Sequence, residues 1–371
     1  MRVGVIGGGQ LARMMVPAAI EMGVGIRVLA ELEGSSAAIA ATAVGDYTDA
    51  AMVLAFARDV DVITFDHEHV PQDVLAALVD AGHAVRPGPD ALAVAQDKIL
   101  MRERLTALGA PVPAWAVVRD ADDLAAFLDD HGGRAVVKTP RGGYDGKGVR
   151  MVSGAHDADD WLAAAAERGL LVEEAVDFRR ELAQLVARRP SGDVRTWPLV
   201  ETVQRDGVCS EVFAPAPDAG ALSDQARALA ERIATELDVS GVLAVELFET
   251  SDGRLLVNEL AMRPHNTGHW TIDGAVTSQF EQHLRAVLDL PLGDPTPTAP
   301  WSVMVNILGG PSGARMPDRY PAAMAAQPGV KFHSYDKPSR PGRKVGHVTA
   351  TGTGLDETAA RARAAAAFFQ G

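Results

Sequence analysis

The sequence is poor in cysteine, in long apolar runs and in positive charge. Its single cysteine, Cys209, excludes an intrachain disulfide and is expected to be a buried or spare thiol. No apolar run reaches the roughly 18 residues of a membrane span, and glycines follow Ile6 too early for a signal peptide. Lys and Arg number 35 against 49 Asp and Glu, giving a net charge of −14 that disfavours nonspecific binding to nucleic acid or anionic membranes. These absences favour a cytoplasmic enzyme.

The 371 residues suffice for two or three domains. In residues 1–94, apolar strands over 3–6, 26–29 and 60–65 and an amphipathic helix over 11–22 predict a parallel sheet with helical crossovers. This Rossmann-like unit is expected to end near the breaker-rich segment 86–89.

Residues 95–290 show a different pattern. A helix is expected over 97–108, strands over 135–138, 149–152, 170–172, 181–188 and 195–203, a helix over 221–237 and a hairpin over 241–260. Four prolines in 291–300 indicate a linker. Strands over 303–308, 330–335 and 347–351 and a helix over 356–369 complete a small β-rich domain, 291–371. The fold class is therefore a mixture of α/β and α+β.

A dinucleotide fingerprint lies at the start of the chain. Gly7-x-Gly9-x-x-Ala12 separates a strand from a helix, and Glu31 follows the second strand where a ribose-binding acid belongs. Alone, this pattern predicts an NAD-binding domain. The same glycines would serve another anionic ligand or a plain tight turn, because any strand-to-helix turn with free N–H groups can hold an anion.

The hairpin over 241–260 carries two opposed glutamates. With Asp252-Gly253 as a two-residue turn, Ser251 pairs with Arg254, and counting back along both strands places Glu246 opposite Glu259 with their Cβ atoms roughly 5 Å apart. Two like charges in this position need a neutralising partner. A divalent cation such as Mg²⁺ fits, with Asn258 as an additional oxygen donor. The alternatives are a solvated edge pair or one raised pKa.

A glycine-rich loop joins the strands over 135–138 and 149–152. Its glycines free the backbone to approach a polyphosphate, and Lys138 precedes it at the end of a strand. Lys147 is not followed by Ser or Thr, so the loop is not a P-loop. The alternative is a solvated hairpin tip. The segment 173–176 could offer backbone groups to an adenine, and Glu181 could bind ribose hydroxyls.

Two further clusters are basic or rich in histidine. Arg263, His265, Asn266 and His269 follow closely on Glu259 and could bind a small anion and move protons. Lys337, Arg340, Arg343 and Lys344 crowd eight residues of an acidic chain, which favours a phosphate-binding patch over a solvated turn.

Taken together, these motifs resemble the ATP-grasp superfamily over essentially the whole chain. The matching segments are Gly7-Gly8-Gly9-Gln10-Leu11, Glu68-His69-Val70, Gly143-Tyr144-Asp145-Gly146-Lys147-Gly148, Asn258-Glu259, Arg263-Pro264-His265-Asn266-x-Gly268-His269-Trp270 and Pro341-Gly342-Arg343-Lys344-x-Gly346-His347. The resemblance implies an N-terminal Rossmann-like (pre-ATP-grasp) domain over 1–94, an ATP-grasp domain over 95–290 with a mobile lid over about 112–175, and the β-rich domain over 291–371.

The resemblance also implies roles for individual residues. It places ATP at Lys98, Lys138, Gly143, Tyr144, Asp145, Gly146, Lys147, Gly148, Val149, Glu173, Glu174, Ala175, Val176, Glu181, Gln204, Asn258 and Glu259. Glu246 and Glu259 would hold Mg²⁺, or Mn²⁺. Aminoimidazole ribonucleotide (AIR) would contact Gln10, Leu11, Glu68, Tyr144, Asp145, Lys337, Arg343 and Lys344, while Arg263, His265 and Asn266 would face bicarbonate and the amine. Lys138, Asp145, Arg263 and His265 would be the catalytic residues.

The implied reaction is the ATP-dependent carboxylation of AIR by bicarbonate, through carboxyphosphate, in purine biosynthesis. The partners would be ATP, AIR and bicarbonate, with a homodimeric assembly and hand-off of the N5-carboxylated product to a mutase. Three alternatives stay open. They are another ATP-grasp ligase, such as a formate-dependent glycinamide ribonucleotide transformylase or a biotin carboxylase, an NAD-dependent oxidoreductase, and a nucleotide-binding regulator without catalysis.

Overall fold

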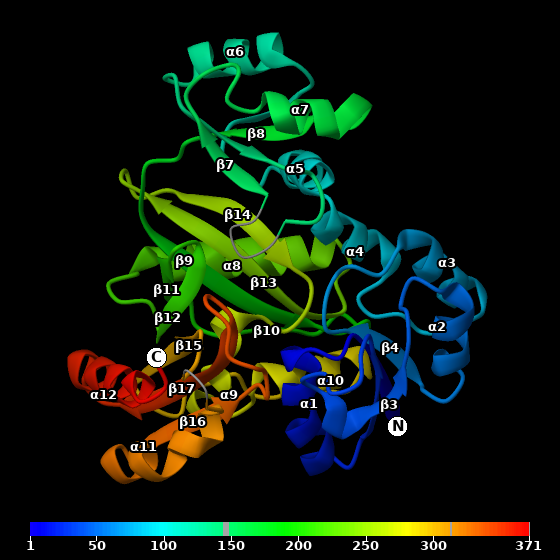
Figure 1. The fold of residues 1–371 in the computed structure, drawn as a ribbon, viewed down its shortest axis with the longest axis vertical. Coiled ribbons are helices and arrows are strands. Elements are labelled where there is room, and N and C mark those ends of the chain that lie inside the picture. Colours follow the sequence, from blue (N-terminus) through cyan, green and yellow to red (C-terminus); the bar gives the residue numbers. More distant parts are fainter. Residues whose placement is uncertain (144–147, 312–313, 371) are drawn as a thin grey trace.

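The computed structural model describes residues 1–143, 148–311 and 314–370, which form three β-sheets with their covering helices (Figure 1). The predictions made for Tyr144, Asp145, Gly146 and Lys147 fall outside the described residues.

The N-terminal sheet is parallel, as predicted. Its strand order is β3-β2-β1-β4, and the apolar residues of β1 are fully buried because helices cover both faces. The short strand β3 has no clear apolar pattern and was not predicted. The strands are β1 (Arg2–Ile6), β2 (Gly25–Ala30), β3 (Ala41–Val44) and β4 (Val62–Phe65), and the helices are α1 (Gln10–Glu21), α2 (Ala50–Ala57), α3 (Gln72–Asp80) and α4 (Pro89–Gln96).

A second, antiparallel sheet stands apart at the top of Figure 1. Its order is β5-β8-β6-β7, and β6 and β7 form the predicted hairpin around the glycine-rich loop. Helix α5 (Lys98–Ala107), capped by the side chain of Asp97, leads from the N-terminal sheet toward it. The remaining elements are β5 (Trp115–Val118), α6 (Ala121–Asp130), β6 (Ala135–Lys138), β7 (Val149–Val152), α7 (Asp159–Ala165) and β8 (Leu170–Glu174).

The third sheet has nine strands and unites the middle of the chain with its C-terminal part. Its order is β14-β13-β9-β11-β12-β15-β17-β16, with β10 beside β9, so the β12–β15 pairing joins strands from either side of the proline-rich segment. The strands are β9 (Phe178–Arg188), β10 (Val194–Thr196), β11 (Val200–Arg205), β12 (Val208–Ala214), β13 (Gly241–Thr250), β14 (Leu255–Ala261), β15 (Trp301–Leu308), β16 (Val330–Ser334) and β17 (Lys344–Gly352). Its helices are α8 (Ala221–Glu236), α9 (Thr271–Gly274), α10 (Gln279–Val287), α11 (Tyr320–Ala326) and α12 (Leu355–Ala367).

The prediction of one strand over 195–203 is wrong. The chain forms β10 and β11 with a break between them at Trp197, Pro198 and Leu199. Proline has no N–H to give to a ladder, and the buried indole of Trp197 donates instead to the carbonyl of Thr277 at 3.1 Å. The break therefore serves core packing that the local sequence does not show.

The two faces of the β13 region have different contents. Leu243, Val245 and Leu247 are buried in the large core cluster that includes residues of α8, whereas Glu246 points to the opposite face. The alternation that predicted the strand thus separates a packed apolar face from a face that carries carboxylates.

The N-terminal sheet is joined to the large sheet through His283 of α10, which is fully buried. Its Nδ1 accepts a hydrogen bond from the backbone N–H of Val242 at 3.1 Å, so its Nε2 carries the proton and faces the Thr64 hydroxyl at 2.8 Å. Burial lowers the pKa of His283 from 6.5 to about 3. The neutral imidazole is thus built into the contact between the two sheets.

We expect acid to destabilise the protein through His283. Because its folded-state pKa lies below the unfolded value, its contribution is present above pH 6.5 and is lost as the pH falls toward 3, at up to ~1.4 kcal/mol per pH unit. A His283→Gln variant should therefore lose less stability than the wild type between pH 7 and 4.5, by roughly 3 kcal/mol. Urea unfolding at both pH values tests this, with His156→Gln, at an exposed histidine, as the control. Equal losses in the wild type and His283→Gln would contradict it.

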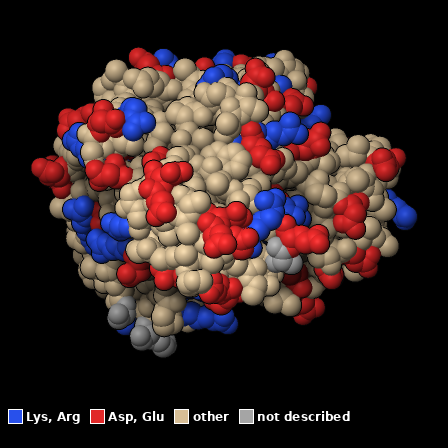
Figure 2. All heavy atoms as spheres, turned by 90° about the horizontal axis from the view of Figure 1, so that it is seen from above, with Lys and Arg blue, Asp and Glu red and all other residues tan. Residues whose placement is uncertain are grey.

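Charges of both signs mingle on the surface. Figure 2 shows acidic and basic side chains interspersed over the face seen from above. None of the helices in the described part of the chain is long and apolar enough to cross a membrane.

Candidate active site

The opposed glutamates lie where the sequence places them, although the turn that predicted them is wrong. Glu246 pairs with Glu259 in the β13–β14 ladder. The turn has three residues rather than two, since Thr250 and Arg254 face each other across it and Gly253 adopts a φ of +80°. A β-bulge at Asn258 then shifts the register back by one residue. The two deviations cancel, and the predicted pair is confirmed.

The electrostatics of the pair suit a divalent cation. Burial, together with the charges of Glu259 and Glu181, raises the pKa of Glu246 to about 8. Glu259 accepts from the Lys98 ammonium at 2.9 Å, and Glu246 lies 3.3 Å from Nε2 of His265. Two crowded carboxylates beside the Asn258 amide are hard oxygen donors. They fit a cation such as Mg²⁺, which commonly binds one or two carboxylates and completes its shell with phosphates and water.

No larger metal cage competes with this pair. Within residues 1–143, 148–311 and 314–370, three or more His, Cys, Asp or Glu side chains nowhere gather in a way that could hold a metal ion. A cation bound by Glu246 and Glu259 would therefore need further oxygen ligands from the phosphates of a bound nucleotide.

Lys138 is held beside the glutamate pair by a buried network. Its ammonium lies 2.7 Å from one Glu173 carboxylate oxygen and 3.3 Å from the Asn258 amide oxygen. The other Glu173 oxygen accepts from Arg102, which also donates to the Asn258 carbonyl at 2.6 Å. Burial alone would raise the pKa of Glu173, but the charges of Arg102 and Lys138 hold it below its usual value. Glu173 is only 2% exposed, and its side chain orients the lysine.

Arg102 was missed by the sequence analysis. It is fully buried on α5, four residues after Lys98, so both cations lie on one face of the helix. That spacing was visible in the sequence, but nothing local indicated that its partners would be Glu173 and Asn258.

The segment predicted to face adenine comprises the last two residues of β8 and the two residues after them. Glu174 accepts from the backbone N–H of Ala114, while Ala175 and Val176 take part in no backbone hydrogen bond among the described residues. Glu181 interacts with the Gln204 side chain, and burial raises the pKa of Glu181. The ladder places both on the same face of the sheet as Glu246. The segment and these polar side chains could therefore border one nucleotide.

The Arg263–Asn266 cluster lies next to the glutamate pair. Arg263 and the backbone N–H of Met262 both donate to the Glu68 carboxylate, at 2.7 and 3.1 Å. Burial, with the charges of Arg263 and Lys344, lowers the pKa of His265 well below 6.5, so the imidazole is neutral. The buried Asn266 amide makes no hydrogen bond to an oxygen or nitrogen among the described residues, and its polar neighbour is the Cys209 thiol. A buried amide beside a weakly hydrogen-bonding thiol keeps the capacity to bind a polar ligand.

The described residues expected to contact AIR lie at the start of α1, in the loop after β4, and in the loop before β17 and at its start. The Gln10 amide oxygen at the start of α1 accepts from the Lys337 ammonium at 2.6 Å. Lys344 opens β17 and interacts electrostatically with Glu246, and Arg343 directly precedes it. Leu11 is 5% exposed and packs in the core, so its side chain is not placed to bind a ligand.

The structure argues against the dinucleotide interpretation. Glu31 accepts a hydrogen bond from the backbone N–H of Gly8 at 2.9 Å and contacts His67. Its carboxylate is therefore already bonded across the glycine turn and is not available to bind a ribose. The buried Asp66 carboxylate accepts from the N–H of Ala12 at the start of α1. Carboxylates already occupy the donors that a pyrophosphate would need, and their charge would repel it.

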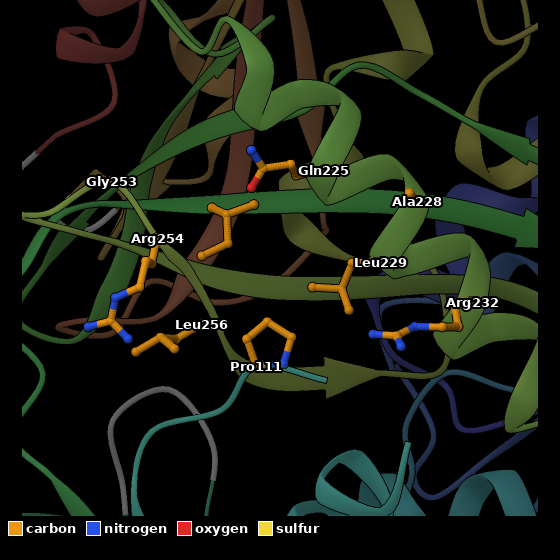
Figure 3. Close-up of a pocket in the computed structure, with 9 residues that line it drawn as sticks. Pro111, Gln225, Ala228, Leu229, Arg232, Gly253, Arg254 and Leu256 are labelled. Carbon is orange, nitrogen blue, oxygen red and sulfur yellow. The ribbon is translucent and has the colours of Figure 1, made fainter. Parts of the chain in front are cut away.

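One cavity lies apart from this chemistry. A largely apolar cavity of about 560 Å³ lies between α8 and the β13–β14 hairpin tip, and its lining includes Leu229, Leu256 and Arg232 but no acidic residue (Figure 3). It is on the α8 side of the sheet, opposite Glu246. Cys209, by contrast, borders the site: it is buried, as expected, burial raises its pKa to about 12, and its thiol interacts with the Asn266 side chain.

Comparison with known proteins agrees with this arrangement. Family models match for the ribonucleotide synthetase preATP-grasp domain over residues 1–96, the ATP-grasp domain over 103–280 and the phosphoribosylaminoimidazole carboxylase C-terminal domain over 302–361. The N5-carboxyaminoimidazole ribonucleotide synthases of Mycobacterium tuberculosis and Corynebacterium ammoniagenes are 51% and 50% identical to the chain. The matches cover 98% and 99% of the chain and 86% and 91% of the relatives.

Solved structures give the same result. The N5-carboxyaminoimidazole ribonucleotide synthetase of Thermus thermophilus matches with a TM-score of 0.87 and 38% identity, covering 97% of each chain. The N5-carboxyaminoimidazole synthase of Aspergillus clavatus, in complex with ADP and 5-aminoimidazole ribonucleotide, matches with a TM-score of 0.87 and 31% identity, covering 99% of this chain and 98% of that one. The chain therefore belongs to the N5-carboxyaminoimidazole ribonucleotide synthase family of ATP-grasp enzymes.

Proposed function

We propose that the chain carboxylates AIR with bicarbonate at the expense of ATP, giving N5-carboxyaminoimidazole ribonucleotide, ADP and phosphate in purine biosynthesis. One observation carries the proposal. The glutamate pair, with Lys98 and Lys138 beside it, directly adjoins the Arg263–Asn266 cluster, so a phosphate site and a small-anion site share one face of the large sheet.

Glu246 and Glu259, with the Asn258 amide, would hold Mg²⁺ or Mn²⁺. When bound, such an ion supplies positive charge to the phosphate oxygens during phosphoryl transfer. Lys138 and Lys98 add fixed ammonium groups to the same region, and both are already held in place by carboxylates. Gly143, Gly148 and Val149 border the phosphates at the glycine-rich loop, Glu173 to Val176 meet adenine through the backbone, and Glu181 and Gln204 meet the ribose.

Arg263, His265 and Asn266 would bind bicarbonate. Its oxygen attacks the γ-phosphorus, ADP leaves, and the resulting carboxyphosphate breaks down to CO₂ and phosphate, which requires that water be excluded. The AIR amine then takes up CO₂ and loses a proton. His265, which is neutral, and the released phosphate are the two candidate bases.

AIR would lie between the N-terminal and C-terminal parts of the chain. Gln10 and Lys337 are already joined there by a hydrogen bond, with Glu68 and Arg263 on the side toward bicarbonate. Arg343 and Lys344 would take the ribonucleotide phosphate. Tyr144 and Asp145 belong to the proposal on the family resemblance alone.

The organisation around the reaction is also a proposal. On the family resemblance, we propose three domains, over 1–94, 95–290 and 291–371, with a lid over about 112–175. The same resemblance leads us to propose a homodimer, a cytoplasmic location and hand-off of the product to a mutase.

The decisive assay is ADP release from MgATP, with AIR and bicarbonate each omitted in turn. We expect ADP formation to require AIR and to yield an acid-labile carboxylated nucleotide. ADP release with glycinamide ribonucleotide and formate, or with biotin, but not with AIR, would move the chain to another ATP-grasp ligase. A loss of ADP formation in all combinations would contradict the proposal.

A further inference from the structure

Helix α5 makes two successive contacts with the bulged part of β14. Lys98 binds the carboxylate of Glu259, and four residues later Arg102 donates to the carbonyl of Asn258. The bulge leaves Asn258 without a partner in the β13–β14 ladder, so its carbonyl needs a donor from elsewhere. Arg102 supplies that donor at 2.6 Å.

Arg102 reaches the lid sheet as well. Its Nε donates to Glu173 on β8, and the other oxygen of that carboxylate lies 2.7 Å from the Lys138 ammonium on β6. The chain of contacts closes on itself, because Lys138 also donates to the Asn258 side chain at 3.3 Å. One fully buried guanidinium thus touches both the strand that carries Glu259 and the carboxylate that holds Lys138.

We propose that Arg102 is a positioning residue that fixes the phosphate-binding lysine relative to the metal-binding glutamates. The inference rests on the proposed function, in which Lys138 and the Glu246–Glu259 pair act on the same phosphates. Arg102 contacts no ligand in this scheme. It acts by holding Glu173 and the bulged carbonyl at once, which a planar fork of donors can do and a single ammonium cannot.

The geometry predicts a selective defect in an Arg102→Met variant. Loss of a residue that orients catalytic or metal-binding groups typically lowers activity or metal affinity about 10- to 100-fold. We therefore expect kcat to fall by about 50-fold and the Mg²⁺ concentration at half-saturation to rise. The KM for AIR should change less than about twofold, because Gln10, Lys337 and Lys344 lie on other elements. Arg104→Met, which removes an exposed arginine from the same helix, is the matched control and should behave as the wild type.

A double-mutant cycle with Glu173→Gln separates positioning from folding. Arg102→Met alone leaves Glu173 with Lys138 as its remaining cation among the described residues. The double variant loses one positive and one negative charge together, so no buried carboxylate there needs a counterion. If Arg102 acts through Glu173, its loss should cost less than about fivefold in kcat in the Glu173→Gln background. Arg102→Lys, which keeps the charge but not the fork, should lie between wild type and Arg102→Met.

Additive losses in the cycle, or an Arg102→Met enzyme with unchanged kcat and Mg²⁺ dependence, would overturn the inference. Equal changes in the KM for AIR and for MgATP would do so too, since they indicate a general loss of structure. Binding of MgADP, measured as the upward shift in Tm, needs neither AIR nor turnover. It therefore reports on Arg102 even if the proposed carboxylation fails, and Arg102→Met should weaken that binding while Arg104→Met does not.

Discussion

A Glu259→Gln variant is expected to lose turnover by about 10³-fold, equivalent to ~4 kcal/mol of transition-state stabilisation, while remaining folded. The carboxylate faces Glu246 across the hairpin and accepts a hydrogen bond from Lys98. Its negative charge would therefore both bind the proposed cation and hold the lysine ammonium in place. An amide keeps the shape but offers a much weaker ligand for Mg²⁺.

The fold should tolerate this change because two effects oppose each other. The variant loses the Lys98–Glu259 ion pair, whose glutamate is 44% exposed, but it also removes the charge that helps to raise the pKa of Glu246. We expect the unfolding free energy to change by less than about 1 kcal/mol. AIR-dependent ADP formation across a Mg²⁺ titration, together with urea unfolding, measures both predictions.

The control for this experiment is Glu236→Gln, which removes an exposed carboxylate near the end of α8. It should keep wild-type turnover. Near-normal turnover of Glu259→Gln at saturating Mg²⁺ would refute the metal assignment.

The hairpin shows what local sequence can and cannot predict. Alternation and the Asp252-Gly253 pair placed Glu246 opposite Glu259, and the structure agrees. The agreement depends on a three-residue turn and a bulge at Asn258 that offset each other. The bulge has no local signal, because it is stabilised by a donation from Arg102, 156 positions away in the chain.

Side-chain partners across elements were the main gap. The acidic segment at the end of β8 was recognised, but the Glu173 side chain is buried against Arg102 and Lys138 rather than exposed toward a ligand. Glu31 likewise matched a ribose-binding pattern, yet it bonds to Gly8 and His67. In each case the residue type and its position in the sequence fitted both a ligand-binding role and a structural role. Only the packing of distant elements decided between them.

A Lys138→Met variant tests the other half of the phosphate site, and we expect kcat to fall by about 10³-fold with a raised KM for ATP. The ammonium is a fixed charge beside Glu173 and Asn258, close to where the phosphates are proposed to lie. Lys138→Arg keeps the charge but not the compact ammonium, so it should restore only part of the activity. Lys331→Met, at an exposed lysine of β16, is the control for loss of a charge alone.

The same variant separates charge balance from catalysis. Without Lys138, Glu173 keeps Arg102 as its counterion, so the loss of stability should be smaller than the ~3–5 kcal/mol that follows when a buried charge is left unpaired. Adding Glu173→Gln to Lys138→Met leaves the fully buried Arg102 without its carboxylate counterion and should cost further stability. Turnover should stay low in the double variant, because the positive charge at the phosphates is still missing. Recovery of turnover together with stability would instead mean that Lys138 serves only to neutralise Glu173.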